Sequence, residues 1–168
     1  MNNFIKSSFL RRHYPIFILI LLLISSCTHI DLYERVVSVS KQDWESSFKP
    51  SFTFDIKDTT VPYQLFLILR HNNKYNYNNI WINLYRKKPD GQVSKVPYEL
   101  QLATNERGWL AEGMDDIYEH RIPLTPPVND TFYFNKTGTY TFTIEQIMRE
   151  DPLKNVMNVG LRIEKKSK

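Results

Sequence analysis

One stretch of the chain, Gly138 to Ile144, alternates between apolar and hydroxyl-bearing residues. In an extended chain Tyr140, Phe142 and Ile144 lie on one side, and three threonines lie on the other. A period of two indicates a β-strand with one buried face and one solvent-facing side. Helical periodicity is weak throughout the chain, so this pattern predicts an all-β protein.

Several other segments carry strand patterns of the same kind. Residues 52–57 and 157–164 alternate, 63–69 are apolar on both faces as in a central strand, and 80–85 and 92–102 flank a Pro-Asp-Gly turn. Residues 36–39 and 131–134 are shorter candidates, and 72–79 and 104–130 are expected to be long loops. These strands predict a two-sheet antiparallel β-sandwich, jelly-roll-like, without internal repeats. We expect its core to include Leu65, Leu67, Ile82, Tyr140, Phe142, Ile144, Val159 and Leu161.

The N-terminus is organised differently. Lys6, Arg11 and Arg12 precede an apolar run over residues 16–24, and Ser25-Ser26 lead to Cys27, the single cysteine. Basic flank, short apolar run and small residues form a secretory signal peptide, and the run is shorter than a membrane span. Residues 24–27 resemble the bacterial lipobox, which predicts acylation of Cys27. A general signal peptide with an incidental cysteine is the alternative. We therefore expect a lipoprotein signal peptide over 1–26, the lipidated cysteine and a tether over 27–48, and the sandwich domain over 49–168.

Removal of the signal peptide changes the charge of the protein. Three of the 22 Lys and Arg residues, and none of the 18 Asp and Glu residues, lie before Cys27. The remaining chain is nearly neutral and gives no reason to expect nucleic-acid binding. With its one thiol acylated, it has no disulfide and no cysteine-based metal site. A lipoprotein cysteine carries two or three acyl chains, which makes membrane lipid a stable partner.

No catalytic or metal-binding motif is evident. HExxH, HxH, CxxC, calcium-loop, phosphate-loop and nucleophile-elbow patterns are all missing from the sequence. The polar cluster over residues 115–121 could be a metal or acid–base site, but we favour a solvated segment with internal ion pairs around a half-buried Tyr118. The sequence therefore predicts a protein that is not an enzyme and has no metal or other cofactor.

The aromatic residues near the asparagine-rich segment allow two interpretations. Tyr75, Tyr77 and Trp81, with five neighbouring asparagines, could form a sugar-binding surface, since rings stack on sugars and amides bond hydroxyls. We favour the other interpretation, in which Trp81 belongs to the core and the asparagines form turns. A carbohydrate-binding module or a glycan-active envelope lipoprotein is therefore the alternative function.

An ordered set of short motifs resembles one known family. The motifs are Arg70-His71-Asn72, Tyr75, Tyr77-Asn78-Asn79-Ile80-Trp81, Gly108-Trp109-Leu110, 116–121, Gly138 with Tyr140, 145–149 and Pro152-Leu153, with Tyr33-Glu34 and Trp44 near the start. Together they resemble the GldH family, gliding motility lipoproteins of the Bacteroidetes. The resemblance implies a non-enzymatic outer-membrane lipoprotein, a structural or adaptor component of the gliding machinery associated with type IX secretion. It supplies no catalytic residues.

Binding residues are expected on loops, because sandwich strands are occupied with burying one another. Two loops, 71–79 and 108–121, combine aromatic anchors with polar groups suited to an interface rim. We expect them to contact an envelope protein partner, although Trp109 and Tyr118 could instead plug one end of the sandwich. The predicted partner-binding residues are Tyr75, Tyr77, Trp109, Asp116, Tyr118, Glu119, His120 and Arg121. Residues 28–31 lack the acidic run of surface-exported lipoproteins, so we expect the periplasmic face of the outer membrane.

Overall fold

The computed structural model describes residues 32–125 and 131–166. Cys27 and the predicted signal peptide lie outside the described residues. The elements are β1 (Leu32–Ser38), the 3₁₀ turn η1 (Ser40–Gln42), β2 (Asp43–Trp44), β3 (Ser51–Ile56), β4 (Tyr63–Asn72), β5 (Asn79–Lys87), β6 (Val93–Gln101), β7 (Ala103–Thr104), β8 (Gly108–Trp109), β9 (Glu112–Met114), β10 (Ile117–Pro123), β11 (Gly138–Gln146), β12 (Leu153–Lys154) and β13 (Val156–Lys165). In this part of the chain no helix is long and apolar enough to cross a bilayer.

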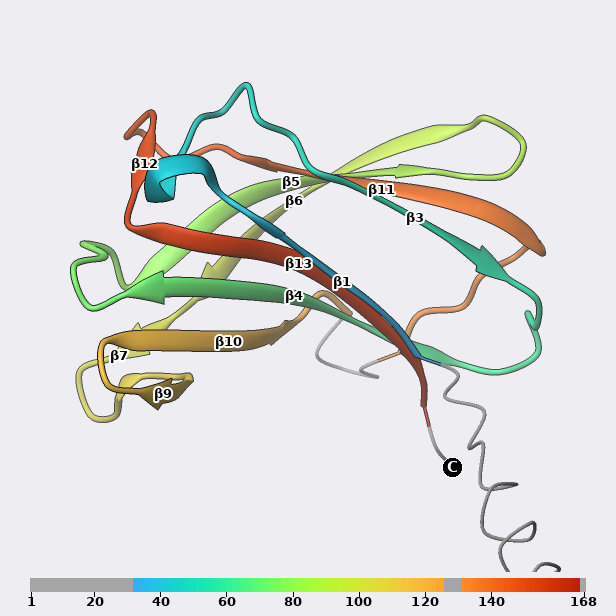
Figure 1. Ribbon diagram of the computed structural model, residues 1–168. Helices are drawn as coiled ribbons and strands as arrows, with labels where there is room; N and C mark the ends of the chain where they lie inside the picture. Colours follow the sequence, from blue (N-terminus) through green and yellow to red (C-terminus); the bar gives the residue numbers. More distant parts are fainter. Residues whose placement is uncertain (1–31, 126–130, 167–168) are drawn as a thin grey trace, which may run out of the picture. The chain divides into compact units, whose positions relative to one another are not determined.

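The strands form two packed antiparallel sheets, which confirms the predicted sandwich (Figure 1). The five-stranded sheet has the order β1-β13-β4-β10-β9, and the four-stranded sheet has the order β3-β11-β5-β6. Two short two-strand ladders, β12-β2 and β7-β8, flank them. The eight long strands alternate between the sheets in the order of a jelly roll, with β5 and β6 as a hairpin within one sheet.

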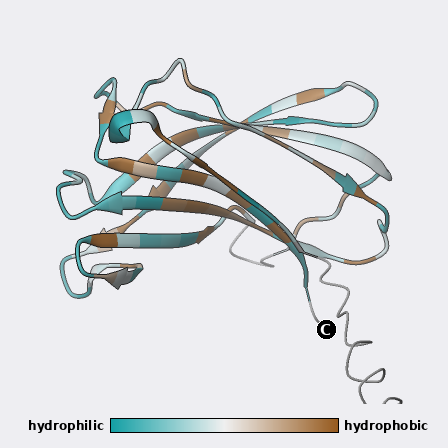
Figure 2. Ribbon diagram, viewed as in Figure 1, coloured by the Kyte–Doolittle hydropathy of each residue, from teal (hydrophilic) through white to brown (hydrophobic). Residues whose placement is uncertain are grey.

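Alternation of side chains along the strands sets which face each sheet buries (Figure 2). Every second residue of β3 is buried, starting at Phe52, and in β11 Tyr140, Phe142 and Ile144 are buried between exposed or half-buried threonines. Strand β4 is buried on both faces over most of its length, as the apolar run over 63–69 predicts. Its neighbours β13 and β10 cover its two edges, which makes it the central strand.

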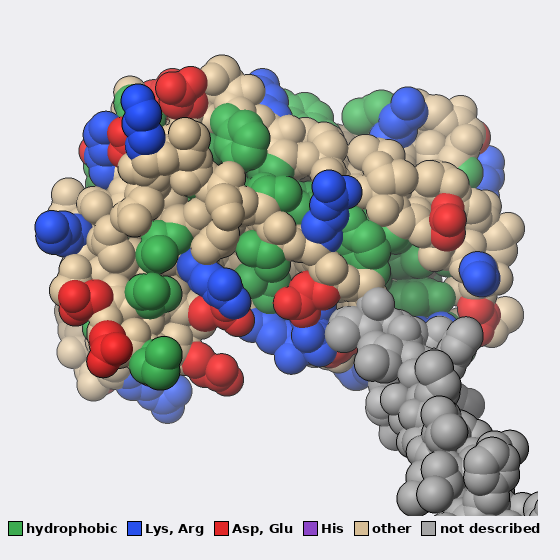
Figure 3. Space-filling view, viewed as in Figure 1, with side chains coloured by type: hydrophobic (Ala, Val, Ile, Leu, Met, Phe, Trp, Pro, Cys, Tyr) green, Lys and Arg blue, Asp and Glu red, His purple; other side chains and the backbone are tan. Residues whose placement is uncertain are grey.

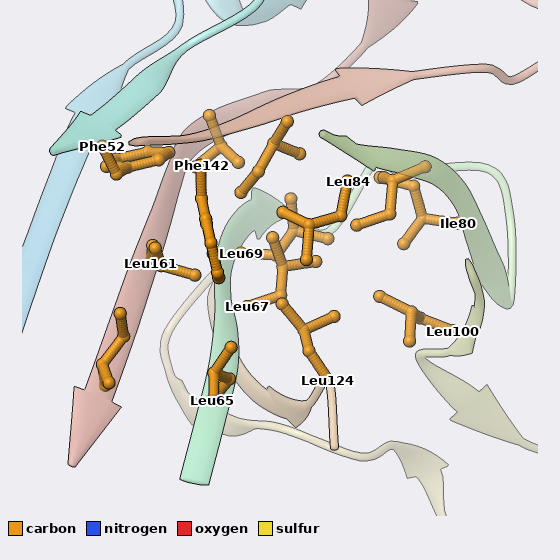
Figure 4. Packing of buried hydrophobic residues seen from close by; sticks show 14 of the residues in the cluster. Phe52, Leu65, Leu67, Leu69, Ile80, Leu84, Leu100, Leu124, Phe142 and Leu161 are labelled. Carbon is orange, nitrogen blue, oxygen red and sulfur yellow. The ribbon is translucent and has the colours of Figure 1, made fainter. Parts of the chain in front are cut away.

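The core lies between the two sheets and is aliphatic and aromatic (Figure 4). Phe142 and Leu84 from one sheet meet Leu67 and Leu161 from the other. Full burial of such a side chain contributes about 1.5–3 kcal/mol, and the described residues hold no disulfide, so packing is the main source of stability. All eight predicted core residues are buried: Leu65, Leu67, Ile82, Tyr140, Phe142, Ile144, Val159 and Leu161.

Three expectations about the ends and loops need correction. The sheet begins at Leu32, inside the range 27–48 predicted as a tether, because β1 pairs with β13 from Leu32 to Ser38. Residues 117–123 form the strand β10, although 104–130 was expected to be a loop. Residues 131–134 contribute a single bridge, between Phe132 and Tyr63, in place of a strand.

Candidate partner-binding site

The fold brings the two predicted binding segments together at one end of the sandwich. The Asn73 Nδ2 atom donates a hydrogen bond to Asp116 Oδ1 at 2.8 Å, which joins the β4–β5 loop to the β9–β10 turn. The rings of His71 and Trp109 lie 4.4 Å apart, centroid to centroid. Strand β10 pairs directly with β4, His71 opposite Tyr118, so neighbouring strands hold the two segments in place.

The alternation of β10 divides the predicted site residues between two faces. Tyr118 and His120 point inward, and His120 is fully buried. Glu119 and Arg121 point outward, where Glu119 forms an ion pair with Arg70. The predicted set therefore contains an inner group that builds the scaffold and an outer group that faces solvent.

His120 of the inner group forms a pair with His71, which was not among the predicted site residues, and both histidines are fully shielded from solvent. His71 Nε2 and His120 Nε2 lie 2.9 Å apart, and both side chains are 0% exposed. His71 Nδ1 lies 2.8 Å from the Asn72 carbonyl oxygen, and His120 Nδ1 lies 3.2 Å from that of Leu110. A neutral pair carries two N–H groups for these three contacts. One of the two contacts to carbonyl oxygens therefore lacks a proton, and the histidine at that contact is the one that donates Nε2–H to the other.

Burial controls the ionisation of this pair. It lowers the pKa of His120 from 6.5 to about 4, with a further lowering by His71, and it also lowers the pKa of His71. An ion placed in line between the two nitrogens would need about 4 Å between them, since zinc–nitrogen bonds are about 2 Å long; the observed 2.9 Å suits a shared proton. Among residues 32–125 and 131–166 no cluster of three His, Cys, Asp or Glu side chains could hold a metal ion.

Aromatic rings surround the histidines. Tyr75 is 4% exposed, lies 4.8 Å from the His71 ring and donates its hydroxyl to the Asn79 carbonyl, and its burial raises the pKa of the phenol. Tyr77 is half-buried at 5.8 Å from Tyr75, and a hydrogen bond with Glu150 raises the pKa of Tyr77. Tyr118 covers Gly113 of β9, where a β-carbon would come within 3.1 Å of the ring.

The outer face beside this cluster is hollowed and partly apolar. A cavity of about 480 Å³ lies over β4, β9, β10 and β13, lined by Arg70, Glu112, Gly113, Met114, Ile117, Glu119, Met157 and Asn158. Met114 is 79% exposed and Ile117 is 43% exposed. Figure 3 shows hydrophobic side chains between charges of both signs over these elements.

Arg121 lies on the same outer face of β10. It forms an ion pair with Glu164 at 2.5 Å, and its guanidinium carbon lies 4.2 Å from the centroid of the Phe66 ring.

Sequence reasoning missed Arg70, Met114, Ile117 and Met157 as members of this surface. The signal for two of them was present, since Met114 and Ile117 flank the turn Asp115-Asp116 and are apolar where solvent exposure is expected. Arg70 comes from β4, which pairs with β10, and Met157 comes from β13, which pairs with the other edge of β4; both pairings join distant parts of the sequence.

The aromatic sugar surface that the alternative interpretation would require is not assembled. Trp81 is 40% exposed on the outer face of the four-stranded sheet, so its interpretation as a core residue is wrong. Tyr75 is buried at the end of the sandwich. One ring is therefore open to solvent and the other is enclosed, and the two form no common exposed platform.

Comparisons with known proteins identify a family that matches this chain. The family model described as GldH lipoprotein matches residues 31–163. The chain is 31% identical over 157 residues to the gliding motility lipoprotein GldH homolog of Christiangramia forsetii, covering 89% of this chain and 93% of that protein. It is 28% identical over 158 residues to the gliding motility lipoprotein GldH of Flavobacterium johnsoniae, covering 90% and 95%. Among solved structures, a carbohydrate-binding module specific for non-crystalline cellulose (CBM28) aligns at 14% identity and a TM-score of 0.44, covering 80% of this chain and 73% of that one. That likeness carries no argument about function.

Proposed function

The chain belongs to the GldH lipoprotein family, and from this we propose that it is a gliding-motility lipoprotein of the outer membrane. In this proposal it is a non-enzymatic structural or adaptor component of the gliding machinery, associated with type IX secretion. The family match spans residues 31–163 and therefore includes both sheets and the candidate site. Two relatives named for gliding motility align over about nine-tenths of the chain.

Membrane attachment in this proposal is through acyl chains on Cys27, at the periplasmic face of the outer membrane. The lone thiol after a short apolar run supports the assignment. Each buried methylene contributes about 0.8 kcal/mol, and two or more chains are needed for stable anchoring. The sandwich then presents its loops and outer faces to other envelope proteins.

The observation that carries the adaptor role is the outer surface of β9 and β10. There the exposed side chains of Met114 and Ile117 border a cavity that also contains the Arg70–Glu119 ion pair. An apolar patch with a polar rim is the usual anatomy of a protein interface. The buried histidine pair and its aromatic neighbours hold this surface rigid from behind, which reduces the entropy cost of binding.

Genetic complementation tests this function. The chain is expressed in a Flavobacterium johnsoniae strain that lacks its own GldH, and spreading on agar is measured. We expect the unaltered chain to restore spreading, and the double variant Glu119→Ala/Arg121→Ala to fail at equal abundance. Exposed ion pairs contribute only about 0–1 kcal/mol, so the melting temperature of this variant should change little. Crosslinking in intact envelopes should show a partner band that weakens with the same variant.

A matched control removes an ion pair elsewhere. Asp43 and Lys154 pair at 2.8 Å with exposures similar to those of the site, so Asp43→Ala/Lys154→Ala should leave spreading and crosslinking unchanged. Tyr118 points inward, so we expect Tyr118→Ala to lower the melting temperature. A loss of spreading that accompanies this lower melting temperature would indicate a structural role for Tyr118 and not direct contact with the partner. If Glu119→Ala/Arg121→Ala restores spreading as well as the unaltered chain does, the outer face of β10 is not the binding surface.

A further inference from the structure

A second cavity lies on the inner face of the four-stranded sheet, away from the candidate site. Along β5 the inward row contains the buried Ile80, Ile82 and Leu84, and the same alternation continues to Arg86 and Lys88. Arg86 pairs in register with Phe142 of β11 on one side and with Ser94 of β6 on the other. The sandwich therefore places a guanidinium group directly after three buried apolar side chains of the same row.

The cavity has a volume of about 350 Å³, within the range of small-ligand sites. Its walls are aromatic and are fixed to both sheets. Phe132 exchanges two backbone hydrogen bonds with Tyr63 of β4, at 2.9 and 2.7 Å. The Phe134 ring lies 4.8 Å from both Phe132 and Tyr140. These contacts make the aromatic wall part of the fold, so the cavity is preformed.

The charges in this cavity are not balanced. Arg86 lies 5.5 Å from the centroid of the Phe132 ring, and its Nε–H is shielded from solvent with no hydrogen-bond partner in the part of the chain that the structure describes. Among the residues that the structure describes, no Asp or Glu lines the cavity. The nearby Asp90 is paired with Lys136 at 2.7 Å, and Lys88 donates to Gln92 Oε1 at 2.9 Å. A shielded donor without an acceptor destabilises the fold unless something else accepts its hydrogen bond.

We propose that this cavity binds a carboxylate joined to an aromatic or aliphatic group. Arg86 binds the carboxylate, and the Phe132 and Phe134 rings bind the apolar part. The planar guanidinium matches a carboxylate in shape and donor spacing. Arg86 and Lys88 are the cations among the described residues that line the cavity, and Lys88 already donates to Gln92, so Arg86 is the cation left to bind an anion. The aromatic walls favour an anion that carries an apolar group over inorganic phosphate, which is polar on every side. The ligand is a small organic acid or the C-terminal carboxylate of a peptide.

Ligand-observed saturation-transfer NMR on the full-length protein in detergent micelles tests this site. The probes are phenylacetate and Gly-Gly-Phe with a free C-terminus, each compared with its uncharged amide. We expect each acid to bind at least about tenfold more tightly than its amide, the effect of one charge-assisted hydrogen bond. Arg86→Gln should remove this preference. Lys87→Gln is the matched control, because Lys87 neighbours Arg86 on β5 but points to the exposed outer face; this variant should keep the preference.

The same experiment also distinguishes the two kinds of ligand, a small organic acid and the C-terminal carboxylate of a peptide. Tighter binding of phenylacetate than of Gly-Gly-Phe supports a small organic acid, and the reverse order supports a peptide terminus. If Arg86→Gln does not fold, the acid-to-amide ratio of the unaltered protein still decides the outcome, and Arg86→Lys should retain part of it. Equal binding of acid and amide, no saturable binding, equal loss in Lys87→Gln, or tighter binding of inorganic phosphate than of either acid overturns the proposal.

Discussion

At the residue scale, the histidine pair makes the stability of this domain sensitive to mildly acidic pH. His120 has an ordinary pKa of 6.5 and a folded-state pKa of about 4. Between these values the unfolded chain binds a proton that the folded protein excludes. With respect to this group, the free energy of unfolding is therefore highest above pH 6.5. It falls as the pH drops from 6.5 toward 4, and below 4 the folded protein also takes up the proton.

The variant His120→Gln should flatten this pH dependence. Glutamine can still donate a hydrogen bond toward His71 Nε2 but has no proton to gain in this range. We expect the free energy of unfolding of the unaltered protein to fall by on the order of 1–3 kcal/mol between pH 6.5 and 4, and that of the variant to fall less. Urea unfolding followed by tryptophan fluorescence measures the difference. Parallel pH curves for the two proteins would contradict the assignment of the titration to His120.

Glu145 provides a second titration in a separate pH window. Its carboxylate is 14% exposed and accepts bonds from Lys49 at 2.5 Å, Tyr85 at 2.7 Å and Asn83 at 2.9 Å. The Lys49 bond first, and then that of Tyr85, lower its pKa from 4.5 to about 2. Its stabilisation is therefore present above pH 4.5 and lost toward pH 2. We expect Glu145→Gln to cost about 1–3 kcal/mol at pH 7, and its unfolding curve to approach that of the unaltered protein near pH 2.

At the element scale, the strands that could be predicted from sequence are those whose inward residues are apolar. Strands β3 and β11 alternate cleanly, so their buried faces follow from the sequence. In β10 the inward row is Tyr118, His120 and Ile122. Because the buried residue in the middle is a histidine, the sequence does not show an apolar row there. In β1 the charged pair Glu34-Arg35 obscures the pattern of an edge strand, so the sequence indicates a short strand only over residues 36–39 and assigns the residues before it to the tether.

The candidate site could be predicted in its residue types but not in its arrangement. Trp109 and Tyr118 were expected to act together as partner-binding residues, with a plug at one end of the sandwich as the alternative, and their rings lie 5.6 Å apart, centroid to centroid. The His71–His120 contact, however, joins residues 49 positions apart through the β4–β10 register. Period-two patterns give the faces of a strand but not its partner. For the same reason the sequence does not show that Met157 and Arg70 share a surface with Met114.

Strand β1 depends on a close approach to β13 that only glycine allows. A β-carbon added at Gly160 would lie 2.7 Å from the Arg35 carbonyl oxygen and 2.7 Å from Val36 Cγ2. Backbone as well as side chain would have to move, so Gly160→Ala should cost about 1–3 kcal/mol through overpacking. Asn158→Ala, in the same outward row of β13, is the control and should cost less, since it removes one exposed hydrogen bond to Ser38. A Gly160→Ala variant as stable as the control would show that β1 shifts freely.

At the scale of the whole molecule, the early start of β1 limits the distance between anchor and domain. Cys27 lies five positions before Leu32, the first residue of the sheet. An extended chain spans at most about 3.6 Å per residue, so an acylated Cys27 would hold the first strand within about 18 Å of its lipid. With such an anchor the sandwich would work close to the bilayer, and a protein partner would also have to reach that surface.

Replacement of the anchor residue tests this view of the molecule. In Cys27→Ala the attachment site of the acyl chains is lost, whereas the first strand begins five residues later, at Leu32, so the sheets contain none of the changed atoms. We expect an alkyne fatty acid to label the unaltered protein but not the variant, and the variant to leave the membrane fraction while its melting temperature stays the same. Protease added to intact cells should spare the unaltered protein and digest it after permeabilisation, as expected for the periplasmic face. Digestion in intact cells would place the domain on the cell surface, and persistent labelling of the variant would mean that Cys27 is not the acylated residue.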